Sequence, residues 1–349
     1  MKIKVIFTGG TIGSSVGSDG YISPNGNQPY KLLEMYKQAY NRTVAETDVV
    51  FDTEEPYRIL SENLDAKHEN LLIQTVAKAL QDKETEGIII THGTDTLQYS
   101  AAILGYVFGT KTVPIVLVSS DFPLEDARAN GVINFAHAVD VIKYRRGTGV
   151  FVSYCNVEQY PVIHRATKLL AHPQYSADVE SVRYQNFGMY FEDEEETEKD
   201  TFLPNEAYHE PEGAYCNLGS LSEDTSLPQL SEDGSGILWV RPYVGMTYPQ
   251  LTEKHQAVLL DSYHSGTIRI SEDLSRFMKE AVEREIPVFL TGIIAEEHAY
   301  ETVGAYEELG IIVLPEISNI AAYCKLWLAI SNHMELVKTM KACVAEDYQ

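Results

Sequence analysis

A strongly apolar run, Gly87–Ile90 (GIII), leads directly into the polar segment Thr91–Thr96 (THGTDT), and a helical pattern follows at Leu97–Leu104. We therefore expect a buried strand that turns into a helix, with a hydroxyl, a carboxylate and a glycine at the turn. A strand with no polar positions must be covered on both faces, as in a parallel α/β sheet. In such sheets ligands bind at this edge, where the free N–H groups of a helix start attract anions.

A second segment of the same type, Thr8–Gly13 (TGGTIG), follows an apolar run at Lys2–Phe7. Strands and helices alternate through this half of the chain, which predicts a parallel, doubly wound sheet of the α/β class. The expected strands are Lys2–Phe7, Val49–Phe51, Ile88–Ile90, Val113–Val118 and Val150–Val152, and the expected helices are Leu32–Tyr40, Asp65–Leu80 and Leu124–Ile142.

The length of 349 residues favours two domains. Residues 1–195 form the expected N-terminal α/β domain. Residues 196–235 carry an acidic insert and show little periodicity, so we interpret them as an exposed linker. Alternation resumes in a smaller C-terminal α/β domain, residues 236–349, with strands expected at 237–240, 257–260, 288–290 and 311–314 and helices at 272–284, 299–309 and 317–342.

The net charge of -24 argues against binding to nucleic acid or to an anionic membrane surface, because both require a basic face. The first residues do not resemble a secretory signal, and no apolar run approaches the ~20 residues that span a bilayer. The four cysteines are widely spaced, which indicates reduced thiols in the cytoplasm and no zinc site or disulfide framework.

Thr11 and Thr94 stand at the two strand ends, and each is a potential nucleophile if a base removes its proton. Asp95 and a lysine with lowered basicity would form a relay for Thr94. Backbone N–H groups of the flanking glycines would form an oxyanion hole. The alternative is that both segments are only tight turns with capping hydroxyls.

The histidines show no metal-ligand spacing, and no sequence motif for a nucleotide, a phosphate or another cofactor is present. His92 is expected to have a structural or hydrogen-bonding role. His164 and His172, which flank Lys168, are expected to be solvated. We therefore expect chemistry without a metal or a cofactor.

Taken together, Thr8–Gly13 and His92–Thr96 resemble the two signature motifs of the bacterial-type asparaginase/glutaminase family, and the resemblance is closest to its cytoplasmic type I branch. The spacing between the two motifs agrees with that of the family. Weaker similarity continues through Pro123–Asn134, Arg165–Lys168 and Ser262–Tyr263, so it covers nearly the whole chain except residues 195–235.

The resemblance implies that Thr11 is the nucleophile that attacks the side-chain amide and forms a β-aspartyl ester. Tyr21, on a lid loop, would activate it. Thr94 would orient or activate the attacking water, with Lys168 and Asp95 as its proton relay.

The resemblance also implies the substrate-binding residues. Ser61 would hold the substrate α-carboxylate, and Asp95 with Glu62 would hold the α-amino group. The backbone would line the pocket at three further positions, namely Gly10, Gly93 and Ser120.

Apart from His264–Gly266 (HSG), which differs from the usual Gly-rich segment after Ser262–Tyr263, the chain departs from the family pattern at two places. Ser119–Asp121 (SSD) replaces the usual Gly-Ser-Gln or Gly-Ala-Met and adds a carboxylate. In Glu316–Ala321 (EISNIA) the usual acidic position is occupied by Ile320. The second change lies where the family forms subunit contacts and any effector site. The acid that a neighbouring subunit would contribute is not identified, and Glu301 is one guess.

The leading hypothesis is an amidohydrolase that converts L-asparagine to L-aspartate and ammonia. A related amide as substrate, or a paralogue that binds an amino acid without turning it over, remains open. An amidotransferase subunit acting on charged tRNA is a more remote option, which the acidic surface disfavours. The resemblance implies a homotetramer or homodimer with sites near the subunit boundary.

Asp121→Gln is expected to alter the substrate preference, because a carboxylate beside the pocket repels an acidic substrate or product. The measurement is kcat/KM over a panel of amides, with the ratios compared between variant and wild type. Identical ratios would contradict a role of this charge in selectivity.

Overall fold

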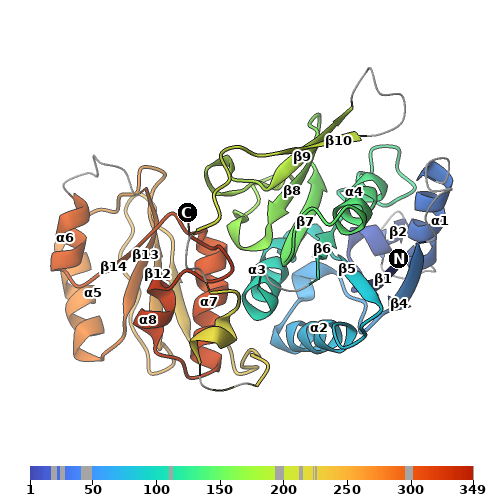
Figure 1. Cartoon of the computed structure of the whole chain (residues 1–349). Coiled ribbons are helices and arrows are strands. Elements are labelled where there is room, and N and C mark those ends of the chain that lie inside the picture. Colours follow the sequence, from blue (N-terminus) through green and yellow to red (C-terminus); the bar gives the residue numbers. More distant parts are fainter. Residues whose placement is uncertain are drawn as a thin grey trace.

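Strand β5 (Thr85–Thr91) lies inside an eight-stranded sheet with the order β10-β9-β8-β7-β6-β5-β1-β4. The computed structural model describes residues 1–16, 22–23, 28–40, 49–109, 113–192, 200–211, 215–222, 224, 226–294 and 302–348. The other strands are β1 (Lys2–Phe7), β4 (Val50–Glu54), β6 (Ile115–Val118), β7 (Val150–Cys155), β8 (Pro161–Arg165), β9 (Gly188–Glu192) and β10 (Asp200–Pro204). Strands β4, β1, β5, β6 and β7 are parallel, whereas β8, β9 and β10 add antiparallel pairs at one side (Figure 1).

The three consecutive isoleucines of β5 explain its central place. Successive side chains of a strand point to opposite faces. Ile88 and Ile90 therefore join one apolar cluster and Ile89 joins another, and all three are fully buried. Helices α2 (Ala66–Ala79) and α3 (Leu97–Phe108) pack in the first cluster, and α1 (Gln28–Tyr40) and α4 (Gly131–Lys143) pack in the second.

A second, four-stranded parallel sheet has the order β11-β12-β13-β14. Helix α7 covers one face, and α5 and α6 cover the other, as Figure 1 shows. The elements are β11 (Ile237–Val240), β12 (Ala257–Asp261), β13 (Val288–Ile293), β14 (Ile312–Pro315), α5 (Glu272–Glu283), α6 (Thr302–Glu308), α7 (Asn319–Ser331) and α8 (Leu336–Lys341). A small ribbon pairs β2 (Ser15–Val16) with β3 (Ile22–Ser23).

Helices α3 and α7 join the two units, because their apolar residues belong to one continuous core. The rings of Tyr99 and Tyr323 meet edge to face with centroids 6.1 Å apart. The thiol of Cys324 contacts the Tyr99 carbonyl oxygen at 3.7 Å. The predicted α/β class and the two-unit organisation are therefore confirmed, with a sheet that is mixed rather than wholly parallel.

Three segments differ from the sequence-based expectation. Helix α4 begins at Gly131 instead of Leu124, because the Asp121 carboxylate accepts from the backbone N–H groups of Phe122 and Asn130 and so stabilises a turn there. Strand β10 lies inside the range expected to be linker. The helix expected over 317–342 is split into α7 and α8, with a break that begins at Asn332.

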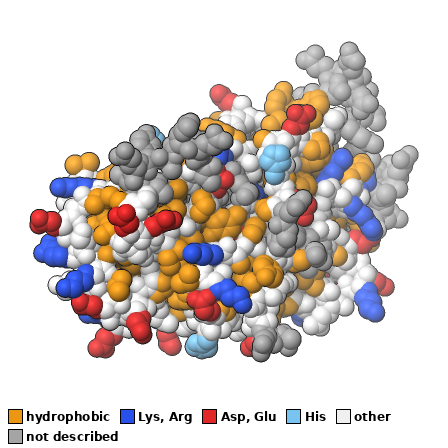
Figure 2. Space-filling view, turned by 60° about the vertical axis from the view of Figure 1, so that its left-hand side comes forward, with side chains coloured by type: hydrophobic (Ala, Val, Ile, Leu, Met, Phe, Trp, Pro, Cys, Tyr) orange, Lys and Arg blue, Asp and Glu red, His pale blue; other side chains and the backbone are white. Residues whose placement is uncertain are grey.

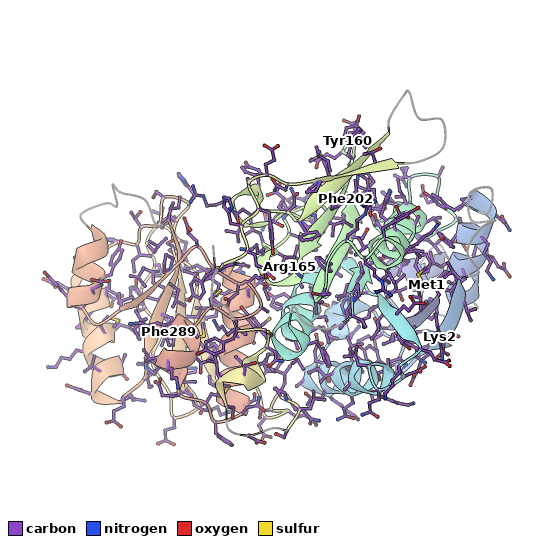
Figure 3. The ribbon with its side chains drawn as sticks, viewed as in Figure 1. Met1, Lys2, Tyr160, Arg165, Phe202 and Phe289 are labelled. Carbon is purple, nitrogen blue, oxygen red and sulfur yellow. The ribbon has the colours of Figure 1, made fainter. Side chains whose placement is uncertain are left out.

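The last residues of the chain are anchored between the two units by buried charges. Lys325 Nζ donates to Asp347 Oδ2 at 2.7 Å, and both side chains are fully buried. Arg165, labelled near the middle of Figure 3, donates through Nε to Glu346 Oε2 at 3.1 Å. Tyr106 Oη adds a 3.0 Å bond to Asp347. These bonds compensate for part of the cost of removing the charges from water.

The surface carries scattered charged side chains around apolar ones on the face drawn in Figure 2. Among the described residues, no helix is both long enough and apolar enough to cross a membrane. The four cysteines are free thiols.

Lys325→Met should lower the free energy of unfolding by about 3 kcal/mol, because it leaves the Asp347 carboxylate buried without its cation. Guanidinium chloride unfolding followed by circular dichroism measures the change. Lys279→Met is the matched control: Lys279 pairs with Glu283 at 3.9 Å, but both side chains are exposed, so its effect should stay below about 0.5 kcal/mol. Equal effects of the two variants would contradict the stabilising role of the buried pair.

Candidate active site

The two threonine motifs meet at the carboxyl ends of neighbouring strands. β1 and β5 are parallel, and Phe7 pairs with Thr91 in their register. Thr8 Oγ1 donates a 2.7 Å hydrogen bond to the Thr91 carbonyl oxygen just beyond the paired residues. The edge of the sheet predicted from the sequence is therefore one continuous surface that carries both motifs.

A backbone contact between two glycines brings the motifs together. Gly10 has a φ of +72°, and a Cβ at this position would lie 2.4 Å from both Cα and N of Gly93. A Cβ on Gly93 would lie 2.4 Å from Ser61 Oγ. Both glycines are therefore required by close approach. Thr11 and Thr94 each follow one of these glycines by one residue.

Ser61 and Asp95 lie beside this contact on two short 3₁₀ turns, Ser61–Asn63 and Thr94–Thr96. Ser61 Oγ donates a long hydrogen bond of 3.5 Å to Asp95 Oδ2, and Thr96 Oγ1 donates to the Ser61 carbonyl at 3.0 Å. Ser61 is buried and Asp95 is exposed. A hydroxyl and a carboxylate thus lie next to the glycine contact, within reach of a small polar ligand.

The remaining predicted residues of this edge differ in exposure. Thr11 and Thr94 are both half-buried, so each residue is partly accessible to solvent. The side chain of Glu62 is exposed beside Ser61. Tyr21, the expected lid residue, and Glu301 lie outside the described residues.

The Ser119–Asp121 turn follows β6 at the same edge. Ser119 Oγ donates to the His92 carbonyl at 2.7 Å, and Ser120 Oγ donates to the Phe122 carbonyl at 2.6 Å. The Asp121 carboxylate accepts from the backbone N–H groups of Phe122 at 2.8 Å and Asn130 at 3.2 Å. The carboxylate that departs from the family pattern therefore has a structural role in holding this turn.

Lys168 lies at the end of the segment after β8 and is fully buried. Its Nζ donates to the Tyr348 carbonyl at 3.0 Å, and burial lowers the pKa of the ammonium group. Within the described ranges it makes no hydrogen bond to Thr94 or Asp95. The structure therefore pairs this predicted relay residue with the C-terminal segment.

His172 contacts the Thr94 motif, and no pattern in the sequence predicts this contact. Its Nε2 lies 2.7 Å from the Thr94 carbonyl oxygen, and its Nδ1 lies 2.8 Å from the Asp178 carbonyl oxygen. The expectation of solvated histidines was wrong: His172 is half-buried, and His164 is buried against Ser181 Oγ at 2.8 Å. His172 and Thr94 are separated by 78 positions, so no local pattern signals their contact.

His92 is buried directly behind the Gly93 backbone, as expected of a structural residue. Its Nδ1 lies 2.8 Å from the Gly93 carbonyl oxygen, and its Nε2 lies 2.8 Å from Ser100 Oγ. Burial lowers the pKa of this imidazole, so the neutral ring is favoured. Among the residues that the structure describes, no group of three or more His, Cys, Asp or Glu side chains is arranged to hold a metal ion.

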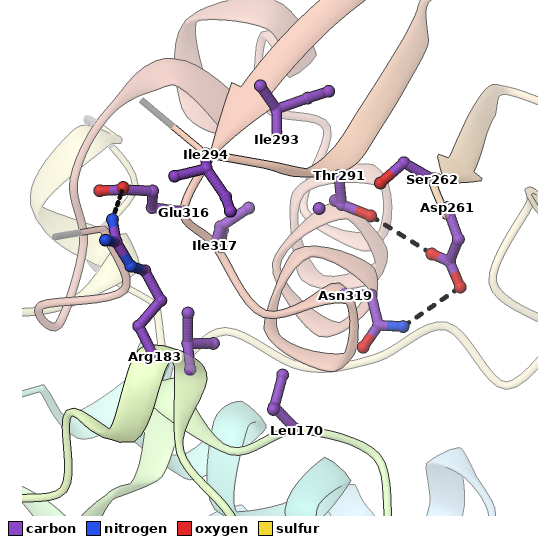
Figure 4. Close-up of a pocket in the computed structure, with 12 residues that line it drawn as sticks. Leu170, Arg183, Asp261, Ser262, Thr291, Ile293, Ile294, Glu316, Ile317 and Asn319 are labelled. Carbon is purple, nitrogen blue, oxygen red and sulfur yellow. Dashed lines mark hydrogen bonds and ion pairs between the residues drawn. The ribbon is translucent and has the colours of Figure 1, made fainter. Parts of the chain in front are cut away.

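A separate cavity of about 250 Å³ lies where the second sheet faces the first unit (Figure 4). Its carboxylates already have partners, since Asp261 accepts from Thr291 Oγ1 at 3.2 Å and Asn319 Nδ2 at 3.1 Å, and Glu316 pairs with Arg183. Ile320, which replaces the family's acidic residue, is fully buried in the core. No residue of the two threonine motifs lines this cavity, so it is distinct from the edge that carries the threonines.

Comparison with known proteins places this arrangement in a family. Residues 2–199 match the family description "Asparaginase, N-terminal". Two solved structures cover the whole chain with a TM-score of 0.75: an L-asparaginase from Thermococcus kodakarensis, 20% identical and 99% covered, and L-asparaginase I from Vibrio cholerae, 19% identical and 99% covered. At these identities, they establish the shared fold.

The curated relatives are named as amidotransferase subunits and not as asparaginases. A glutamyl-tRNA(Gln) amidotransferase subunit of Saccharolobus islandicus is 29% identical over 171 residues, 48% of this chain and 37% of the relative. Its counterpart in Methanopyrus kandleri is 34% identical over 144 residues, 40% of this chain and 30% of the relative. The matched region thus spans about a third of their length. The match over residues 2–199 covers more than half of the chain and contains both threonine motifs, so this chain belongs to the asparaginase family.

Proposed function

We propose that this protein hydrolyses the side-chain amide of L-asparagine to L-aspartate and ammonia. The observation that carries the proposal is the Gly10–Gly93 contact, which brings Thr11 and Thr94 to one edge beside Ser61 and Asp95. A pair of helix caps has no need of a hydroxyl from a third loop that bonds to the carboxylate beside Thr94. A site for an amino-acid amide needs both reactive and binding groups together.

In the proposed reaction, Thr11 Oγ attacks the amide carbon and loses its proton. The C–N bond then breaks, the nitrogen takes up a proton and ammonia leaves, with the acyl group held as an ester on Thr11. Water, oriented by Thr94, adds to the ester and restores the hydroxyl as aspartate departs. Backbone N–H groups of the glycine-rich turns would stabilise the oxyanion. Tyr21 remains the proposed activator of Thr11.

Recognition of the substrate would use opposite charges at its α-carbon. Ser61, with the N–H groups of its 3₁₀ turn, would hold the α-carboxylate. Asp95 and the exposed Glu62 would hold the α-ammonium group. Gly10, Gly93 and Ser120 would line the pocket through their backbones. Lys168 remains the proposed proton relay to Thr94, a role that requires its amine to leave the Tyr348 carbonyl.

A second candidate is transfer of amide nitrogen, because the curated relatives above are amidotransferase subunits. The net charge of -24 disfavours a tRNA-bound substrate. An amide other than asparagine, or binding without turnover, would be compatible with the same edge. We further propose a cytoplasmic protein that assembles as a homodimer or homotetramer with sites near the subunit boundary, as in the family it belongs to.

Thr11→Ala should reduce ammonia release from L-asparagine by at least about 10³-fold, because it removes the oxygen that forms the ester. The readout is ammonia released over time, with the fold checked by circular dichroism. Thr252→Ala, at an exposed threonine of the second unit, is the control and should keep full activity. Release that survives in both Thr11→Ala and Thr94→Ala would refute the assignment, and saturable amino-acid binding without release from any amide would favour the binding-only alternative.

Lys168→Met should lower kcat by about 10²-fold and leave KM within a factor of a few, because the amine is assigned to proton transfer and not to substrate binding. Steady-state kinetics on L-asparagine measure both parameters. Lys279→Met, a change at an exposed lysine, serves as control. A wild-type kcat in Lys168→Met would show that Lys168 only anchors the C-terminal segment through Tyr348.

A further inference from the structure

Three buried polar side chains form a hydrogen-bonded chain behind the Thr94 motif, and the proposed reaction does not use them. Glu69 on α2 contacts Ser100 Oγ on α3 through Oε1 at 2.5 Å, and Ser100 Oγ contacts His92 Nε2 at 2.8 Å. His92 Nδ1 contacts the Gly93 carbonyl at 2.8 Å. The exposed fractions of the residues Glu69, Ser100 and His92 are 2%, 0% and 2%. The Glu69 carboxyl group is thus linked through Ser100 and His92 to Gly93, the glycine that contacts Gly10.

The number of hydrogens in the chain limits its states. The Gly93 carbonyl only accepts, so His92 Nδ1 carries a hydrogen. Ser100 has one hydroxyl hydrogen and donates it either to Glu69 or to His92 Nε2. With one further proton shared between Glu69 and His92 Nε2, the chain is either neutral, with a protonated Glu69 donating to Ser100 and Ser100 donating to Nε2, or an ion pair of carboxylate and imidazolium. These two forms contain the same number of protons, and loss of that proton gives a third form, a Glu69 carboxylate beside a neutral His92.

Burial favours the neutral form. It raises the pKa of Glu69 to about 7 and lowers the pKa of His92, so both groups resist ionisation. Glu69 Oε2 has no hydrogen-bond partner among the described residues, so a carboxylate would be poorly stabilised there.

The other titratable neighbours of Glu69 are neutral at physiological pH. They are the Tyr57 hydroxyl and the Cys324 thiol on α7, whose pKa values are raised chiefly by burial and further by Glu69. Asp65, which also acts on Tyr57, is a carboxylate at the start of α2, where its Oδ1 lies 2.6 Å from His68 Nδ1. In the described part of these elements, no cation contributes to the pKa of Glu69, so its ionised form lacks a counter-charge.

We propose that Glu69 is a positioning residue: its protonated carboxyl, acting through Ser100, holds His92 in the Nδ1–H tautomer that fixes the Gly93 carbonyl and with it the loop that carries Thr94. When Glu69 ionises, it takes the Ser100 hydrogen, and His92 Nε2 loses its donor. His92 regains a bond to Ser100 only as the Nε2–H tautomer, which turns an Nδ1 lone pair against the Gly93 carbonyl. Turnover therefore falls on the alkaline side. This effect on turnover rests on the proposed amide hydrolysis.

Glu69→Gln tests the proposal because a glutamine amide donates to Ser100 at every pH and does not ionise. In the wild-type enzyme we expect kcat to fall about tenfold between about pH 6 and about pH 9, with a midpoint near 7. In Glu69→Gln this decrease of kcat at alkaline pH should be absent. Glu69→Leu should lower kcat at every pH, because it abolishes the donor, and Glu84→Gln, at an exposed position, should keep the wild-type profile.

A readout without substrate separates this proposal from the function. In protein labelled with ¹⁵N-histidine, the His92 signals, assigned with His92→Gln, should change from the Nδ1–H to the Nε2–H tautomer with a midpoint near 7 in the wild type and stay unchanged in Glu69→Gln. The proposal would be overturned if the His92 tautomer does not change with pH in the wild type, or if kcat still decreases at alkaline pH in Glu69→Gln. The tautomer change without hydrolysis of any amide would refute the proposed function alone.

Thermal unfolding gives a second independent check. The pKa of Glu69 is higher in the folded chain than in the unfolded chain, so its protonated form favours folding at low pH and this contribution is lost as the pH rises through 7. The wild-type Tm should therefore decrease more between about pH 5 and about pH 8 than that of Glu69→Gln. Equal slopes would contradict the buried, neutral carboxyl.

Discussion

The contact between the Gly10 and Gly93 backbones is the constraint on which the candidate site depends. Each glycine occupies a place where a Cβ would overlap the neighbouring loop. Parallel pairing of β1 with β5 brings the two loops to the same edge, and the missing side chains let them touch. Because Thr11 and Thr94 each follow a glycine of the contact by one residue, the backbone packing itself sets their proximity. The two threonines are thus held by the scaffold and not by long, flexible side chains.

Exposure is graded across this edge. The hydroxyl-bearing Thr11 and Thr94 are half-buried, Asp95 is exposed, and the groups behind them, Glu69, Ser100 and His92, are buried. Such a gradient combines access for a small ligand with a rigid support, since buried polar groups that are hydrogen-bonded to one another have few alternative positions. His172 adds a contact to the Thr94 carbonyl from a distant loop.

The second unit contacts the first through α3 and the C-terminal segment. Helix α3, which begins directly after the Thr94 turn, packs against α7 of the second unit in one core. In the C-terminal segment, Glu346 accepts a hydrogen bond from Arg165 and Asp347 accepts one from Lys325. The Tyr348 carbonyl accepts a hydrogen bond from the Lys168 amine. Solved structures named as L-asparaginases share this fold, and curated relatives named as amidotransferase subunits match about half of the chain.

Local patterns predicted much of this protein. The apolar run of β5, the start of α2 within one residue of Asp65 and the two threonine turns follow from neighbours in sequence, because strand burial, helix starts and glycine turns are local effects. The antiparallel strands β8–β10, the start of α4 at Gly131, the His172–Thr94 contact and the Lys168–Tyr348 bond were not predicted. By itself, the sequence determined which residues stand at the strand ends. Only the tertiary structure decided which side chains reach them from distant loops, because those contacts depend on how separate elements pack and leave no periodic pattern along the chain.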